Sequence, residues 1–177
     1  MKQLIECVPN FSEGNNMEVV RQITETIESV EGVKLLNVDP GKATNRTVVT
    51  FVGEPEFVTE AAFRAIAKAA ELIDMKNHHG EHPRMGATDV CPFIPVANIS
   101  LEDTVKWSVK LARRVGQELK IPVYLYEAAQ PEEYRNNLSV IRAGEYEGFG
   151  DKIKLPEWKP DYGPASFPPG QASIQEV

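Results

Sequence analysis

The chain lacks the sequence features that indicate a membrane protein, a protein of an oxidising compartment or a nucleic-acid-binding protein. No run approaches the ~20 apolar residues of a membrane helix, and residues 1–6 are not the long apolar stretch of a secretory signal. Only two cysteines occur, Cys7 and Cys91, so we expect both to be free, small buried residues in a reducing cytoplasm. The net charge of −7 lacks the basic excess that nucleic-acid or membrane-surface binding usually needs. Any anionic ligand would therefore need a local basic pocket.

The 177 residues suffice for one domain with a hydrophobic core, and 42% of them are hydrophobic. Alternating or β-branched runs predict strands, and apolar residues three and four apart predict helices. The predicted strands are 3–8, 33–38, 46–52, 90–96 and 121–126; the predicted helices are 19–30, 55–73, 101–119 and, more briefly, 131–136. The order β-α-β-β-α-β, then α-β, predicts an α+β fold: a two-layer, ferredoxin-like sandwich with an added α-β unit and helices on one face of a mixed sheet.

The last thirty residues differ in composition from the rest. Five prolines punctuate the stretch after Gly148, and aliphatic residues are few. We therefore predict that the compact part covers residues 1–147 and that residues 148–177 form a connecting segment. The tail from Gly170 to Val177 shows no clear packing role.

Histidine is also scarce, and its distribution is informative. All three histidines fall within residues 78–82, in the irregular run 77–89 that also holds acids, an arginine and two glycines. Pro83 favours extended backbone at His82. A histidine in such an irregular loop could face a cleft and act as a general acid/base, or it could be a surface or capping residue. His78 and His79 follow the predicted long helix. We expect them to interact favourably with the carbonyl groups at its C-terminal end.

A metal site is the alternative use of these histidines. Their spacing matches no compact Cys/His pattern, so we expect no metal, although a metal-dependent hydrolase stays a competing hypothesis. Arg46 and Arg84 are the natural carboxylate binders, against the alternative of surface ion pairs. Asp39 is either a turn former or a binder of a cationic group. We expect the loops 10–16, 39–46 and 77–89 to meet on one side of the sheet.

Three motifs resemble the glutamate formimidoyltransferase family, which also forms the front of the bifunctional formimidoyltransferase-cyclodeaminase. They are Cys-Val-Pro-Asn-Phe-Ser-Glu-Gly at 7–14, Asn-Arg-Thr-Val-Val at 45–49 and Gly-Glu-His-Pro-Arg-Met-Gly-Ala-Thr-Asp at 80–89. The stretch 160–164 is similar to the family's folate-binding segment, so the resemblance assigns folate contacts to Gly163, Pro164, Ala165, Ser166 and Phe167. It covers residues 3 to about 167.

The resemblance implies transfer of a formimino group from N-formimino-L-glutamate to N5 of tetrahydrofolate, the co-substrate, in histidine degradation. His82 matches the family's catalytic histidine. The attacking amine must lose a proton and the departing nitrogen must gain one, so one histidine of near-neutral pKa suits both steps. From charge alone, Asp39 could hold the amidine, and Arg46 or Arg84 a glutamate carboxylate.

The resemblance also implies a partner. Family transferase domains continue into a second subdomain after the segment that matches 161–164, and the substrate tunnel lies between the two. We expect this chain to supply the histidine and one wall, with a C-terminal subdomain as partner. Apolar surface left bare on the sheet would favour a homodimer. A non-catalytic folate- or partner-binding half-domain is the alternative.

Overall fold

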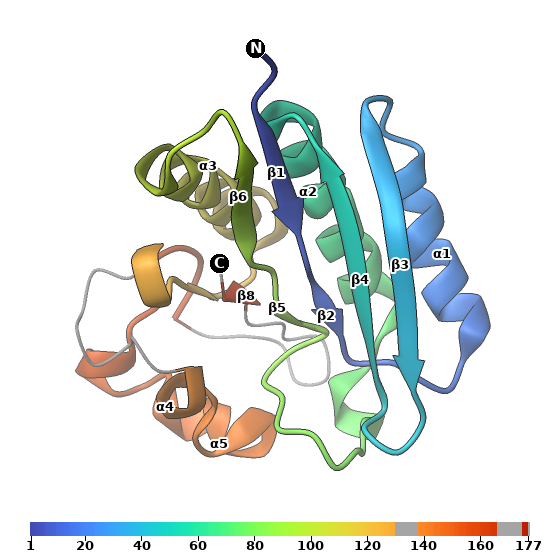
Figure 1. Cartoon of the computed structure of the whole chain (residues 1–177). Coiled ribbons are helices and arrows are strands. Elements are labelled where there is room, and N and C mark those ends of the chain that lie inside the picture. Colours follow the sequence, from blue (N-terminus) through green and yellow to red (C-terminus); the bar gives the residue numbers. More distant parts are fainter. Residues whose placement is uncertain (130–137, 166–174, 177) are drawn as a thin grey trace.

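A mixed sheet forms the centre of the fold (Figure 1) in this computed structural model, which describes residues 1–129, 138–165 and 175–176. The sheet order is β6-β1-β4-β2-β5-β8-β7, and β3 pairs with β4. The first strands pair antiparallel, whereas β8 pairs parallel with β5 and β7. The strands are β1 Leu4–Cys7, β2 Asn10–Phe11, β3 Val33–Gly41, β4 Arg46–Gly53, β5 Thr88–Val90, β6 Phe93–Ala97, β7 Val123–Tyr124 and β8 Gln175–Glu176.

The two long N-terminal helices cover one face of this sheet, behind it in Figure 1. They are α1 Met17–Glu28 and α2 Pro55–Leu72. α3 Leu101–Arg114 packs against α2 and β6, and α4 Leu138–Arg142 and α5 Glu145–Lys152 lie beyond the far end of the sheet. The predicted α+β class is confirmed. Among the described residues, no helix combines the length and apolar character needed to cross a membrane.

Side-chain alternation on β4 explains why one sheet face is covered. Thr47, Val49 and Phe51 are buried against the helices, while the intervening residues from Arg46 to Val52 are half-buried on the opposite, open face. The buried stripe of α2 is mainly alanine, which lets the helix approach the sheet closely. Ser100 caps α3 by accepting a hydrogen bond from the Asp103 amide.

Three predicted strand boundaries were wrong. β3 runs on to Gly41, which pairs with Arg46, so Asp39 lies in a strand and not in a loop. The predicted strand at 90–96 is split into β5 and β6, because Pro92 has no N–H for a strand ladder. The strand predicted at 121–126 contains only Val123–Tyr124.

The late part of the chain packs more closely than its composition suggests. α5 crosses the boundary predicted at residue 147, and its Phe149 lies with Tyr124, Ile141 and Met85 in a second buried cluster. β8 places residues 175–176 in the sheet, although we predicted no packing role for that tail. Ala143 and Gly144 form a turn between α4 and α5, and the short helix predicted at 131–136 lies outside the described residues.

Candidate active site

The three predicted loops do meet at one end of the sheet. The Ser12 amide donates to Ala87 O over 2.8 Å, and the Gly14 amide donates to Asn45 Oδ1 over 2.9 Å. The Glu81 amide donates to Ala43 O over 3.2 Å. A side chain at Gly80 could not fit, since its Cβ would lie 2.2 Å from Thr44 O. This close packing fixes the backbone on both sides of His82.

His82 lies half-buried between this loop framework and β4. Its Nδ1 is 2.6 Å from Pro83 O, so Nδ1 carries the proton and donates to that carbonyl. Nε2 is then a bare acceptor, and it accepts a hydrogen bond from Arg46 Nη1. The imidazole is therefore held in one tautomer, with its basic nitrogen directed at a guanidinium.

The surroundings of His82 favour its neutral form. Burial lowers its pKa from the ordinary 6.5, and the positive charges of Arg46 and Arg142 lower it further. The Pro83 carbonyl and the Asp89 carboxylate act in the opposite direction. The balance leaves His82 unprotonated at neutral pH, as a general base requires.

Arg46 and Asp39 share the open face of the sheet. Arg46 pairs with Gly41 and Val48 pairs with Asp39, so the two charged side chains stand diagonally on neighbouring strands. Asp39 is exposed, and Arg46 is half-buried, which lowers its pKa. The structure therefore brings Arg46 to His82 and leaves Asp39 open to solvent on the same face.

Arg84 occupies a different position, where its guanidinium is held by other protein groups. Its side chain is 7% exposed and forms ion pairs with Glu145 at 3.1 Å and Glu147 at 2.6 Å. Its Nε donates to His78 Nδ1 over 2.9 Å, and Nη2 donates to His78 O over 3.0 Å. Every N–H of this guanidinium already has a protein acceptor, which leaves none for the substrate carboxylate that we predicted for it.

The prediction that His78 lies at the end of the long helix was wrong. α2 ends at Leu72, and a 3-10 turn, η1 Met75–Asn77, separates it from His78. The side chain is buried, with Nε2 2.9 Å from Asn45 O and Nδ1 accepting from Arg84. These partners require a neutral imidazole protonated on Nε2. Of the neighbouring pair, only His79 is exposed.

Protonation of His78 should destabilise the fold. Burial lowers its folded-state pKa below the ordinary 6.5, so its stabilising contribution is complete above pH 6.5 and is lost as pH falls from 6.5 through the lower folded-state pKa. We expect the free energy of unfolding to decline below pH 6.5, by up to ~1.4 kcal/mol per pH unit for each proton bound. Urea titrations of wild type and His78→Asn between pH 7.5 and 5 measure the decline, with His79→Asn as the control. An equally steep decline in His78→Asn would contradict the assignment.

A charged pair that we did not predict, Asp89 with Arg142, lies beside His82. Asp89 is fully buried; its Oδ2 accepts from Arg142 Nη2 over 2.6 Å and its Oδ1 from the Met85 amide over 2.6 Å. Burial raises the pKa of the Asp89 carboxyl, which the Arg142 charge opposes. Arg142 comes from α4, and nothing in its sequence surroundings sets it apart from other helix-end arginines. Only the fold brings it to the histidine loop.

The predicted folate segment is described as far as Ala165; Ser166 and Phe167 lie outside the described residues. Gly163 has a φ of +87°, and a Cβ there would lie 2.2 Å from Ile121 O, so glycine is required. The Val123 amide donates to Tyr162 O over 2.9 Å, which ties this segment to β7.

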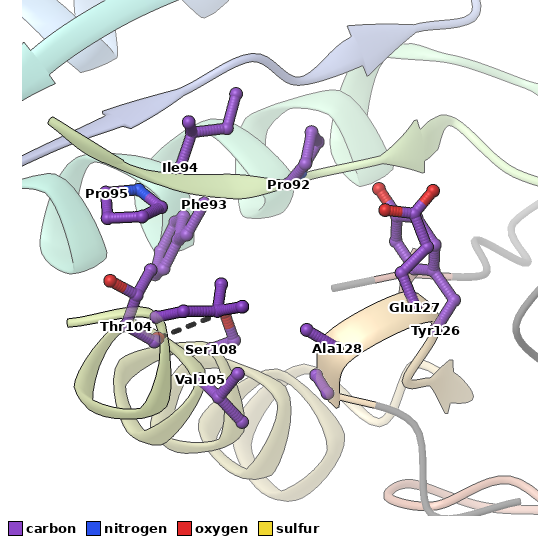
Figure 2. Close-up of a pocket in the computed structure, with 12 residues that line it drawn as sticks. Pro92, Phe93, Ile94, Pro95, Thr104, Val105, Ser108, Tyr126, Glu127 and Ala128 are labelled. Carbon is purple, nitrogen blue, oxygen red and sulfur yellow. Dashed lines mark hydrogen bonds between the residues drawn. The ribbon is translucent and has the colours of Figure 1, made fainter.

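A cavity of about 220 Å³ lies elsewhere, between β6, α3 and the turn η3 Glu127–Ala129. Figure 2 shows Phe93 and Pro95 on one side and Val105 and Ser108 on the other. It shares no residue with the surroundings of His82, so it is not part of the histidine site. Across residues 1–129 and 138–165, no three His, Cys, Asp or Glu side chains are grouped to hold a metal ion. Cys7 and Cys91 are free, buried thiols whose sulfurs lie 3.5 Å apart.

Comparison with known protein families matches residues 4–174 to the formiminotransferase domain, N-terminal subdomain. The chain belongs to this family. The formimidoyltransferase-cyclodeaminase of Mus musculus is 55% identical over 169 residues, covering 96% of this chain. The glutamate formimidoyltransferases of Streptococcus pyogenes serotype M1 and Thermoplasma acidophilum are 44% and 46% identical, covering 96% and 97% of it.

The chain spans only part of the length of those relatives. The matched region is 31% of the mouse protein, 56% of the Streptococcus pyogenes protein and 57% of the Thermoplasma acidophilum protein. The relatives therefore contain further sequence beyond the region that corresponds to this chain.

Proposed function

We propose that this chain is the N-terminal catalytic part of a glutamate formimidoyltransferase, which moves the formimino group of N-formimino-L-glutamate to N5 of tetrahydrofolate in histidine degradation. The observation that carries the proposal is His82 itself, held as a neutral Nδ1–H tautomer with Nε2 directed at the Arg46 guanidinium. The named relatives add support, because two of them are glutamate formimidoyltransferases.

The proposed reaction needs one proton carrier. The folate N5 attacks the formimino carbon and forms a C–N bond, and its proton passes to His82 Nε2. The resulting tetrahedral intermediate carries nitrogens on its carbon, so no oxyanion has to be stabilised. His82 then returns the proton to the glutamate nitrogen as that C–N bond breaks. The histidine ends the cycle neutral, which matches its lowered pKa.

We assign the charged neighbours to substrate groups. Asp39, exposed on the open face, is assigned to the cationic amidine, and Arg46 is assigned to a glutamate carboxylate. Arg84 is instead assigned a positioning role, since Glu145, Glu147 and His78 occupy its donors. The segment from Gly163 to Phe167 is proposed to contact the folate.

The open sheet face supports the proposed partner. Leu36, Ile94 and Val96 are exposed there, at 51%, 41% and 53% of their surface. We infer that a C-terminal subdomain, part of the further sequence of the relatives, covers this face and closes the site; the homodimer predicted from the same surface stays a prediction. The order β3-β4-β1-β6, with two helices on one face, supports a ferredoxin-like core.

A transfer assay tests the proposed function. We expect no or slow transfer by the chain alone, and transfer by a chimera in which it replaces the matching residues of the Thermoplasma acidophilum relative. Chromatography of released glutamate and formiminated folate measures the reaction, and circular dichroism verifies folding. A folded but inactive chimera that still binds reduced folate in calorimetry would favour the alternative, a non-catalytic folate-binding half-domain.

A further inference from the structure

Two guanidinium groups with unused donors lie beside His82. Arg142 Nε is buried and has no hydrogen-bond partner, and among the described residues Arg142 Nη2 donates to Asp89 alone. Within the described part of the chain, the Arg46 guanidinium has a single hydrogen bond, the one from Nη1 to His82. A buried donor without an acceptor is costly, so its presence marks a place where an acceptor belongs.

The charges at this place do not cancel. Arg46 and Arg142 each bring one positive charge, the carboxylate of Asp89 brings one negative charge, and neutral His82 brings none. The two arginines are close enough that the charge of Arg142 lowers the pKa of both Arg46 and His82. A single bound carboxylate would neutralise the excess and supply acceptors for the unused N–H groups.

We propose that Arg142 and Arg46 form a carboxylate subsite beside His82, and that a bound carboxylate draws the Arg46 N–H away from His82 Nε2. The inference rests on the proposed function, and the ligand class is a glutamate-type dicarboxylate. In the free chain, the basic nitrogen of His82 is blocked by Arg46. Substrate binding gives Arg46 a better, anionic acceptor and so exposes the Nε2 lone pair when the substrate is in place.

The carboxylate also changes the proton affinity of His82. The groups that face His82 are Arg46 from β4, Arg142 from α4, Asp89 from β5 and the Pro83 carbonyl of its own loop. Neutralising the two arginines removes the charges that disfavour the imidazolium. The pKa of His82 should therefore rise towards its ordinary value when the carboxylate binds.

NMR of the 177-residue chain tests this with glutarate as the probe, read from the imidazole Cε1–H signal of His82. Saturable binding with a higher His82 pKa is expected, while sodium chloride of equal ionic strength should not reproduce the effect. Arg142→Lys keeps the ion pair with Asp89 but lacks the Nε–H, so glutarate affinity should fall about 10- to 100-fold. Arg21→Lys, an exposed arginine on α1, should bind like wild type.

A second variant separates the subsite from loop structure. Asp89→Asn with Arg142→Met removes both charges and keeps an acceptor for the Met85 amide, so it should fold and lose saturable glutarate binding. An unchanged His82 titration in wild type, or wild-type affinity in Arg142→Lys, overturns the proposal. Glutarate binding in a chain whose chimera transfers nothing would leave the subsite standing and reject the transferase. Transfer by the chimera without any effect of glutarate would support the transferase and reject the subsite.

Discussion

Replacing His82 with alanine is expected to lower kcat of formimino transfer by about 10²–10⁴-fold, the usual contribution of a general acid/base. No other side chain among the described residues stands in the same place with a bare basic nitrogen, because the two nitrogens of His78 are both occupied. The free energy of unfolding should change by less than ~1 kcal/mol, since His82 is half-buried and lies in a loop. The chimera described above provides the assay.

The pH dependence separates a chemical role from a structural one. Because the base must be unprotonated and its pKa is lowered from 6.5, the acid limb of kcat/KM should fall below pH 6.5 and vanish in His82→Ala. His79→Ala, an exposed neighbour in the same loop, is the matched control and should retain the wild-type profile. A His82→Ala protein with the full rate would eliminate the catalytic assignment.

Local sequence patterns were sufficient for the elements that bury a single face. The apolar residues of α1 and α2 recur every three or four positions, and β4 alternates strictly, so both types of element could be predicted. The pattern failed at Asp39, because Pro40 and Gly41 resemble a turn although they pair with Thr47 and Arg46. Pairing with a distant strand decided that boundary, and local composition does not record it.

The site residues also divide into those that local sequence features predict and those that only tertiary packing brings together. His82 could be found because it lies in a motif and beside Pro83, and both are local features. The burial of His78 depends on Asn45 and Arg84, and the charge balance at His82 depends on Arg142, 60 residues further along the chain. No spacing rule connects these residues, since tertiary packing alone brings α4 to the histidine loop. For the same reason Arg84 resembled a ligand binder until its buried partners were known.

The Asp89–Arg142 pair leads to the second large expected effect. Asp89→Ala should lower the free energy of unfolding by about 3–5 kcal/mol, because it strands Arg142 in a site where its side chain is only 14% exposed. The Met85 amide would also lose its acceptor. Urea denaturation with circular dichroism measures the change. The exposed Asp151, which pairs with Lys154 at 3.9 Å, provides the control Asp151→Ala, which should change stability by under ~0.5 kcal/mol.

The cost should come from the unpaired charge and not from a lost attraction. Burial already disfavours the Asp89 carboxylate, so the intact pair contributes little beyond satisfying both partners. Asp89→Asn combined with Arg142→Met should therefore recover most of the stability lost in Asp89→Ala, while Asp89→Asn alone should not. If the double variant is as unstable as Asp89→Ala, the ion pair itself stabilises the histidine loop. In that case the charge of Arg142 on α4 would have a structural role first, and ligand binding would be secondary.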